Sequence, residues 1–426
     1  MDLAQRDQNV IWHPYTQMKT AALPIPIMRG DGALLFAEDG KTYIDAVASW
    51  WVNLHGHAHP YIAQKVAQQL QTLEHVIFAG FTHPAAVELA ERLLQILPAN
   101  QKRAFYSDNG STAVEVAIKM AIQYWNNVGQ PKRKIIAFRD SYHGDTFGAM
   151  AVSSRSTFTA PFWSYLFDVE FIDVPVQGQE EEALKQLEAI AVAGGAAAFI
   201  YEPLVLGTAG MVMYTPEVLD KLMGICKKYS VLTIADEVMT GFGRTGRNFA
   251  SHYVQHQPDM MCFSKGLTGG TMALGLTTCS NQIYEAFLHD DKSKTFFHGH
   301  SYTGNPIACS AGLASLDLLL QEETQQSINR IGQQHNIFAA NARKLQHVKE
   351  VRQQGTILAV EFEAGQTSYF SNLRDTLYNF ALEQGVLLRP LGNIIYIIPP
   401  YCITNEQLEQ IYKTILGMHE LVANLH

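Results

Sequence analysis

The sequence predicts an α/β protein with a large, mostly parallel sheet domain and a smaller α+β domain. Between about residue 100 and residue 320, short and nearly continuous apolar segments alternate with helical segments. This alternation is typical of a parallel sheet that is covered by helices on both faces. A chain of 426 residues is also too long for one small core, so a second domain is expected.

The first part of the chain, residues 1–55, is expected to join the smaller domain. The stretches IPIMRGDGALLF and GKTYIDA are short apolar runs punctuated by Asp-Gly, which indicates hairpin strands. Residues 56–321 are predicted to form the large domain. Its expected elements are, in order, helices in HPYIAQKVAQQLQTLEHV and HPAAVELAERLLQILP, strand RAFYS, helix STAVEVAIKMAIQYW, strands KIIAF and AAAFIYEP, helix TPEVLDKLMGICKKY, strands VLTIADE and PDMMCFS, and helix NPIACSAGLASLDLLL.

The last part, residues 322–426, is predicted to be the smaller α+β domain. It opens with a polar helix over about 322–346, and strands follow near VKEVR, TILAVEF and IIYIIPP. No internal repeat, low-complexity tract or long linker interrupts the chain.

The composition excludes several classes of protein. The net charge of −9 without a basic run argues against a nucleic-acid binder. No apolar run approaches the ~20 residues that cross a bilayer, and the N-terminal MDLAQRDQNVIWHPYTQ has no signal-peptide pattern. The cysteines form no framework spacing, so we expect reduced thiols and a cytoplasmic protein. They are Cys226, Cys262, Cys279, Cys309 and Cys402.

Lys265 lies in CFSKGLTGG, between an apolar run and a glycine-rich turn. Taken alone, it is more simply explained as a solvated cation past a strand end than as a lysine that bonds covalently to a ligand. Asp236 ends the preceding apolar strand VLTIADE, where a carboxylate needs either a protein partner or a cationic ligand. Ligands of an open α/β sheet bind outside the carboxyl ends of its strands, so both side chains could reach one ligand. Glu237 beside Asp236 is expected to be structural.

Two further clusters follow strand ends. In SDNGST, Gly110 and Ser111 open a helix whose free N–H groups could bind an anion, most plausibly a phosphate, although simple capping explains the same residues. In SYHGDT, Tyr142 either presents its ring to the crevice or is a buried core residue.

The four clusters together fit one cofactor, pyridoxal 5′-phosphate. Its aldehyde bonds to a lysine, and a carboxylate pairs with its pyridine nitrogen. Free lysine has a pKa of about 10.4, and burial together with a cationic cofactor would lower it toward the range of a useful base.

The histidines of HGHAH, residues 55–59, raise the question of a metal site. No acidic or cysteine ligands accompany them, and the neighbouring glycine and proline favour a loop. No metal is expected here.

The run IADEVMTGFGRTG…QPDMMCFSKGLTGG resembles the signature of class III aminotransferases, which have the fold type I of pyridoxal-phosphate enzymes. The resemblance implies that Lys265 bonds to the cofactor and that Asp236 pairs with its pyridinium. It further implies that Gly110 and Ser111 bind the phosphate and that Tyr142 stacks on the ring.

The same resemblance implies a homodimer with a shared active site. A loop of the partner subunit closes the phosphate site in this family, and here it matches Gly299, His300 and Ser301. The family usually has Gly-Pro-Thr at these positions. Ser301 keeps the hydroxyl, whereas His300 replaces a rigid proline.

Other segments resemble the branch of this family that acts in biotin biosynthesis. They are WHPYTQ (12–17), SWWVNLHGHAHP (49–60), YHGDTFGAM (142–150), GGTMAL (269–274) and LRPLGNIIYIIPPY (388–401). That branch converts 8-amino-7-oxononanoate to 7,8-diaminononanoate, with S-adenosylmethionine, or lysine in some relatives, as amino donor. The alternatives are another ω-aminotransferase acting on a diamine or ω-amino acid, and a silent cofactor-binding scaffold. Retention of Lys265 and Asp236 together speaks against the scaffold.

The resemblance also implies residues for the substrate. Arg389 matches the arginine that binds the substrate carboxylate, for which a guanidinium is well suited. Aromatic walls would come from Tyr15, Trp50 and Trp51, with Tyr396 as a weaker candidate. Tyr142 and Gly299 are also expected to contact the substrate.

Overall fold

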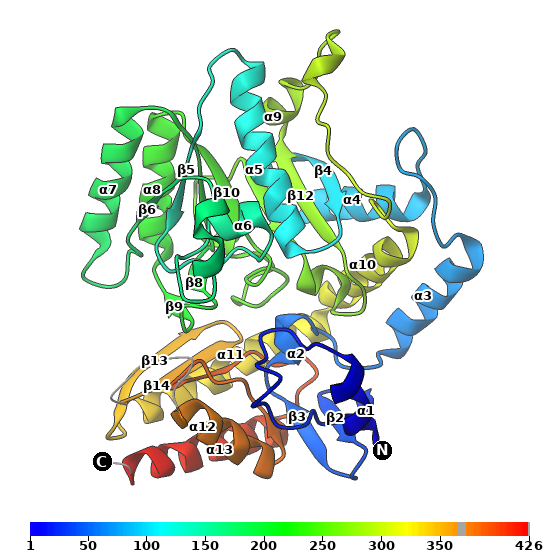
Figure 1. The fold of residues 1–426 in the computed structure, drawn as a ribbon, viewed down its shortest axis with the longest axis vertical. Coiled ribbons are helices and arrows are strands. Elements are labelled where there is room, and N and C mark those ends of the chain that lie inside the picture. The colour runs from blue at the N-terminus through cyan, green and yellow to red at the C-terminus, as the bar shows by residue number, and fades with distance from the viewer. Residues whose placement is uncertain (364–371, 425–426) are drawn as a thin grey trace.

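The computed structural model describes residues 1–363 and 372–424. A seven-stranded sheet lies in the upper half of the molecule as drawn in Figure 1. The strand order is β4-β12-β11-β10-β7-β5-β6. Five neighbouring strands from β11 to β6 pair in parallel, and β12 runs antiparallel to both β11 and β4. The sheet is therefore mostly parallel, as predicted. The strands are β4 (Gln101–Ser107), β5 (Lys134–Phe138), β6 (Val169–Ile172), β7 (Ala196–Tyr201), β10 (Leu232–Asp236), β11 (Met260–Phe263) and β12 (Gly275–Ser280).

Successive residues of these strands serve two cores. Ile135, Ile234 and Met260 pack under α5 on one face, and their neighbours Ile136 and Met261 belong to the larger core on the opposite face. Side chains of a strand alternate between faces, so a sheet covered on both sides needs the continuous apolar runs seen in the sequence.

Helices and short hairpins complete this part of the chain. Proline opens α3, α4, α8 and α10. Proline has no backbone N–H, and an N–H in the first helical turn would have no partner within the helix, so nothing is lost there. These elements are α3 (Pro60–Thr72), α4 (Pro84–Ile96), α5 (Gly110–Asn127), α6 (Phe147–Ala151), α7 (Glu180–Ala193), β8 (Val205–Leu206), β9 (Val212–Met213), α8 (Pro216–Lys228), α9 (Asn281–Glu285) and α10 (Pro306–Leu319), with 3-10 turns η1 (Ala160–Tyr165), η2 (Ala250–Tyr253), η3 (Lys265–Thr268) and η4 (Lys292–Lys294).

The N-terminal and C-terminal segments of the chain lie together below the large sheet, with the two termini on opposite sides (Figure 1). The order β1-β2-β3-β15 joins N-terminal strands to a C-terminal one, and β13, β14 and β16 form an antiparallel sheet. This pairing supports the assignment of residues 1–55 to the smaller domain, while the domain boundaries stay predictions. The elements are α1 (Leu3–Val10), β1 (Ile27–Asp31), β2 (Leu34–Ala37), β3 (Thr42–Asp45), α2 (Ala48–Trp51), α11 (Glu322–Ala342), β13 (Val348–Gln354), β14 (Ile357–Phe362), α12 (Asn372–Glu383), β15 (Val386–Leu387), β16 (Ile394–Ile397) and α13 (Asn405–Ala423).

Other features agree with the sequence. All five cysteines are free, and four of them are buried. Among the described residues, no helix combines the length and the apolar character that crossing a bilayer requires.

Candidate active site

Asp236 and Lys265 come from the carboxyl ends of two neighbouring strands. Asp236 is the last residue of β10, and its partner in the parallel strand β11 is Cys262. Lys265 opens η3, directly beyond the end of β11. The sequence predicted this placement from the two apolar runs, and the parallel pairing brings both residues to the same edge of the sheet.

The carboxylate of Asp236 has a protein partner that the sequence reasoning missed. Its Oδ2 lies 2.6 Å from Nδ1 of His143, and its Oδ1 accepts a hydrogen bond of 3.1 Å from the N–H of Val238. His143 is fully buried in the loop after β5. Nε2 of His143 has no hydrogen-bond partner among the described residues. The signal was present, since SYHGDT holds a histidine beside Tyr142.

The ammonium of Lys265 lies over an aromatic ring. Its Nζ is 4.7 Å from the ring centroid of Trp51. Burial lowers the pKa of Lys265, while the charges of Asp236 and Glu202 act in the opposite direction. The turn after it is built on Gly269 and the following glycine, with φ of +62° and +84°, a conformation that glycine adopts without strain.

The start of α5 forms a tight cradle. Asn109 caps the helix by accepting a 3.0 Å hydrogen bond from the N–H of Thr112. A Cβ on Gly110 would lie 2.8 Å from Val238, so only glycine fits there. Oγ of Ser111 accepts from the N–H of Asp145 at 3.2 Å. The cap uses the N–H of Thr112, the third residue of the helix. The N–H groups of the first two helical residues, Gly110 and Ser111, are not used by this cap, so the helix is capped and can still offer N–H groups to an anion.

Glu202 is a second buried carboxylate that the sequence reasoning did not single out. It directly follows β7, the neighbour of β10, and accepts from the N–H groups of Tyr142 at 3.0 Å and Gly207 at 2.9 Å. Burial raises the pKa of Glu202 to about 7. The rule that identified Asp236, a carboxylate at the end of an apolar strand, applies equally to Glu202 in AAAFIYEP.

The two predicted tryptophans lie on an unusual turn. Residues 48–51 all have positive φ, between 46° and 73°, although none is glycine. Each such residue costs about 1–2 kcal/mol. The Trp51 ring is buried and packs against Gly207, where a Cβ would lie 3.1 Å from the ring atoms Cζ3 and Cη2. Trp50 remains partly exposed.

The remaining substrate candidates surround this turn. The guanidinium carbon of Arg389 lies 4.2 Å from the ring centroid of Trp50, and the Trp50 ring meets that of Tyr15 at 5.6 Å. The hydroxyl of Tyr15 lies 3.4 Å from that of Tyr142 and also donates to Asp145. Burial raises the pKa of the Tyr142 hydroxyl. These residues come from four distant parts of the sequence, and Trp50 is next in the chain to Trp51, whose ring lies under Lys265.

Tyr396 lies behind this wall. It is buried in β16, and its ring centroid lies 6.0 Å from that of Trp51 in an edge-to-face arrangement.

The structure does not bring Gly299, His300 and Ser301 into this cluster within one chain. The hydrogen bonds found for His300 are local, to Thr303 and to the N–H of Tyr302. Nε2 of His300 is buried without a hydrogen-bond partner among the described residues.

The histidines of the HGHAH loop have separate partners. His55 bonds Ser315 at 3.0 Å, and burial lowers its pKa to about 3. Nε2 of His57 lies 2.9 Å from Oδ2 of Asp45. Two of the three imidazoles of this loop, those of His55 and His57, are thus hydrogen-bonded to other side chains of the protein.

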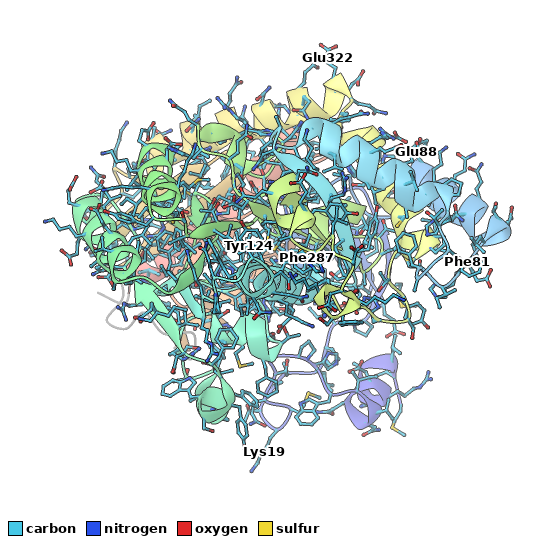
Figure 2. All side chains as sticks on the ribbon, turned by 90° about the horizontal axis from the view of Figure 1, so that it is seen from above. Lys19, Phe81, Glu88, Tyr124, Phe287 and Glu322 are labelled. Atoms are coloured by element: carbon cyan, nitrogen blue, oxygen red, sulfur yellow. The ribbon has the colours of Figure 1, made fainter. Side chains whose placement is uncertain are left out.

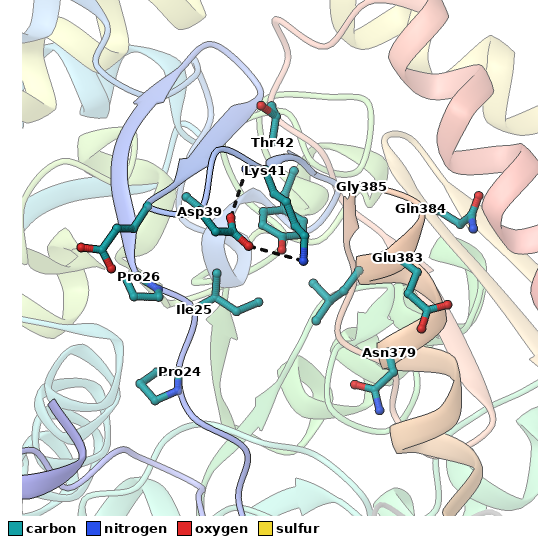
Figure 3. A pocket seen from close by; sticks show the side chains of 14 residues that line it. Pro24, Ile25, Pro26, Asp39, Lys41, Thr42, Asn379, Glu383, Gln384 and Gly385 are labelled. Atoms are coloured by element: carbon teal, nitrogen blue, oxygen red, sulfur yellow. Dashed lines mark hydrogen bonds and ion pairs between the residues drawn. The ribbon is translucent and has the colours of Figure 1, made fainter. Parts of the chain in front are cut away.

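A groove of about 940 Å³ lies elsewhere, between the β2–β3 turn and the end of α12 (Figure 3). The ion pair of Lys41 with Asp39, at 3.4 Å, lies on its wall. None of the predicted site residues lines this groove.

The cluster fits pyridoxal 5′-phosphate on three structural grounds. The Asp236 carboxylate is held in place at a strand end, and the Lys265 amine has a lowered pKa. Beside the α5 cradle, the buried Oγ of Ser107 has no hydrogen-bond partner among the described residues. A lysine, a carboxylate and an anion site at one sheet edge are the groups that this cofactor requires.

Comparison with known proteins agrees with the geometry. The aminotransferase class-III family model matches residues 15–418. A Synechococcus elongatus protein named adenosylmethionine-8-amino-7-oxononanoate aminotransferase is 46% identical over 418 residues, covering 96% of this chain and 98% of that protein. The Methanocaldococcus jannaschii protein of the same name has a crystal structure with a TM-score of 0.93 and 33% identity, covering 99% of this chain and 98% of that one. A PLP-bound amine transaminase from an uncultivated Pseudomonas species has a TM-score of 0.90 and 30% identity, covering 97% of this chain and 99% of that one.

Fold and site together define a pyridoxal-phosphate-dependent transferase. More narrowly, the chain belongs to the class III aminotransferase family.

Proposed function

We propose that this enzyme transfers an amino group to 8-amino-7-oxononanoate and forms 7,8-diaminononanoate, with S-adenosylmethionine as the amino donor. The observation that carries the proposal is the wall of Arg389, Trp50 and Tyr15, in which Trp50 is next in the chain to Trp51, the ring that lies under Lys265. A long keto acid needs an apolar surface along its chain and a cation for its far carboxylate. The names of the Synechococcus and Methanocaldococcus relatives support the same substrate and donor.

Lys265 and Asp236 are the proposed catalytic residues. When bound, pyridoxal phosphate supplies a ring that accepts the electrons released as the substrate C–H bond breaks. Asp236 would hold a proton on the pyridine nitrogen through its carboxylate, which His143 and the Val238 N–H orient. Nζ of Lys265 would hold the aldehyde carbon and then move the proton of the reacting carbon, for which a lowered pKa is useful.

Gly110 and Ser111 are proposed to bind the phosphate with the N–H groups at the start of α5. Tyr142 would cover the ring. Glu202 fixes Tyr142 by accepting its N–H. We therefore add Glu202 and His143 as positioning residues of this site.

Arg389 is proposed to bind the substrate carboxylate, with the rings of Tyr15, Trp50 and Trp51 along the aliphatic chain. Trp50 holds the guanidinium on its face at 4.2 Å, which limits the directions in which Arg389 can present its N–H groups. Tyr396 would support Trp51 from behind.

We further propose a homodimer in which Gly299, His300 and Ser301 complete the partner's phosphate site and Gly299 its substrate site. Two adjoining loops support this interface. The ring of His75 contacts that of Tyr302 at 5.5 Å, so the loop before α4 lies beside the loop before α10.

These two loops expose large apolar side chains. The exposed fractions are 58% for Ile77, 64% for Phe81, 73% for Phe297 and 67% for Tyr302. Phe81 projects from the edge of the molecule (Figure 2). A concentration of such side chains is typical of a protein interface.

The dimer is tested by sedimentation of the holoenzyme. The wild type should sediment as a dimer, and Phe81→Glu should raise the dissociation constant at least tenfold. Ile337→Glu on α11, a similarly exposed apolar position with 60% exposure, should leave the dimer unchanged. A fully active monomeric wild type would exclude the shared site.

A cytoplasmic location is proposed from the five free cysteines, since a reducing compartment keeps such thiols reduced.

The function is tested by supplying the purified holoenzyme with 8-amino-7-oxononanoate and either S-adenosylmethionine or lysine. Mass spectrometry of 7,8-diaminononanoate is the measurement. We expect 7,8-diaminononanoate to form with S-adenosylmethionine. If it forms with lysine but not with S-adenosylmethionine, the proposed donor is wrong and the proposed acceptor stands. No product with either donor, together with turnover of a diamine, would favour another ω-aminotransferase. No turnover of any amine would indicate a silent scaffold.

A further inference from the structure

The segment that carries Trp50 and Trp51 is held in a left-handed turn. Its φ values are 49° at Ala48, 46° at Ser49, 72° at Trp50 and 73° at Trp51. Non-glycine residues rarely adopt this conformation, and a run of them persists only where the surroundings determine it. Such strain is often found at functional sites.

The surroundings centre on Asp45, the last residue of β3, which is fully buried. Its Oδ1 accepts from the N–H groups of Ser49 at 2.9 Å and Val47 at 3.3 Å. Its Oδ2 accepts from the Ser49 hydroxyl at 2.7 Å and lies 2.9 Å from Nε2 of His57. One carboxylate therefore binds both the backbone and the side chain of the strained residue.

The exit of the turn is fixed as well. Nδ1 of His57 lies 3.1 Å from Nδ2 of Asn53, and Arg244 donates to the Asn53 carbonyl at 3.0 Å. A Cβ on Gly270 would lie 2.9 Å from the Asn53 nitrogen, so the Lys265 loop abuts the same residue.

The turn carries the side chains of Trp50 and Trp51, and the two rings contact different neighbours. Trp51 lies under Nζ of Lys265 at 4.7 Å, and Trp50 lies against Arg389 at 4.2 Å. A relaxed right-handed turn would redirect both side chains, because adjacent residues project according to the backbone that carries them. The proposed substrate spans the distance from the amine of Lys265 to the guanidinium of Arg389. That distance therefore depends on the conformation of the turn.

We propose that Asp45 and His57 are positioning residues that set the specificity of this enzyme for a long substrate with a distal carboxylate. They act through Trp50 and Trp51 and touch neither cofactor nor substrate. The inference rests on the proposed function, since it presupposes a substrate that reaches from Lys265 to Arg389.

The first test is Asp45→Asn in the holoenzyme, because asparagine keeps the shape and removes the charge. KM for 8-amino-7-oxononanoate should rise at least tenfold, while kcat changes less than threefold and the absorbance of the bound cofactor is unchanged. His57→Phe should act in the same direction. Asp39→Asn, in the exposed β2–β3 turn, is the matched control and should have no effect. A fall in kcat with unchanged KM would overturn the proposal.

The second test compares Ser49→Ala with Ser49→Gly, and it remains decisive if Asp45→Asn fails to fold. Both variants lose the hydroxyl bond to Asp45, but glycine tolerates positive φ without strain. Ser49→Ala should raise KM for the keto acid at least fivefold and alter the near-ultraviolet circular dichroism of the tryptophans. Ser49→Gly should stay within about twofold of the wild type in KM and keep the spectrum. Equal effects of the two variants, or none, would overturn the proposal.

The wild type assayed in parallel separates this inference from the function. If the wild type does not turn over the keto acid, the proposed function fails by itself. The spectra then decide the positioning role. Altered dichroism in Asp45→Asn and Ser49→Ala, but not in Ser49→Gly, supports this role. Unchanged dichroism in both Asp45→Asn and Ser49→Ala overturns it.

Discussion

Nδ1 of His143 lies 2.6 Å from Oδ2 of Asp236, and both side chains are buried at the carboxyl edge of the large sheet. The other carboxylate oxygen accepts from the N–H of Val238. The carboxylate is thus oriented from two sides before any ligand binds. Preorganised charge of this kind costs no rearrangement during the reaction.

Asp236→Asn should therefore lower kcat at least about 30-fold. The substitution removes the charge that Asp236 would pair with the protonated pyridine nitrogen, and removing one charge of a buried hydrogen-bonded pair costs about 2 kcal/mol or more. Single-turnover kinetics of the amino-donor half-reaction measure the effect. Asp259→Asn is the matched control. That carboxylate is bonded to Thr233 near the opposite end of β10, so its loss should affect stability and spare kcat. Equal losses of kcat in both variants would contradict the role of Asp236.

Because the pKa of Glu202 is raised in the folded protein, we expect the stability of the apoprotein to depend on pH. Its pKa is raised by burial from 4.5 to about 7, so the folded state binds more protons than the unfolded state between these values. The free energy of unfolding should therefore fall as pH rises from about 4.5 to 7. Glu202→Gln removes this dependence, and its stability relative to the wild type should improve by about 2–3 kcal/mol from pH 5 to pH 8.

Urea unfolding at the two pH values measures this difference. Glu217→Gln, an exposed position at the start of α8, should show no such gain. A relative stability of Glu202→Gln that does not change with pH would contradict the raised pKa.

Gly207→Ala should displace Trp51, because its Cβ would lie 3.1 Å from the ring. Crowding of this size costs about 1–3 kcal/mol, and KM for the keto acid should rise several-fold. Gly224→Ala in α8 is the control. Among the described residues its Cβ would meet only His256, at 3.4 Å, and alanine favours a helix, so stability should be unchanged or improved. A wild-type KM in Gly207→Ala would argue against Trp51 as a substrate wall.

Arg389→Met should raise KM for the keto acid about 30-fold, since a charged hydrogen bond to a carboxylate contributes about 2 kcal/mol. Methionine keeps the contact with Trp50 while removing the guanidinium. A primary amine without a carboxylate, assayed as amino donor, should keep its KM. Equal losses for both substrates would indicate a structural role for Arg389.

The central pair could be predicted from the sequence because strand ends are visible in apolar runs. Asp236 and Lys265 both follow such runs, and parallel pairing brings their positions together. The strand β12 was not singled out, although GLTTCS separates β11 from β4. Its antiparallel direction follows from long-range pairing that no local pattern contains.

The left-handed turn at Trp50 and Trp51 could not be predicted, since non-glycine residues with positive φ have no reliable sequence signature. Its stabilising partner Asp45 is identifiable only once β3 and the HGHAH loop are placed side by side. His143 and Glu202 were in quoted motifs, but their contacts with Asp236 and Tyr142 depend on three neighbouring strands.

The claim that Lys265 bonds to pyridoxal phosphate is tested most directly by borohydride reduction of the holoenzyme, followed by peptide mass spectrometry. Reduction makes the lysine–cofactor bond permanent. We expect the phosphopyridoxyl label on the tryptic peptide that contains Lys265, and no label in Lys265→Ala. A label on another lysine, or an undiminished label in Lys265→Ala, would contradict it.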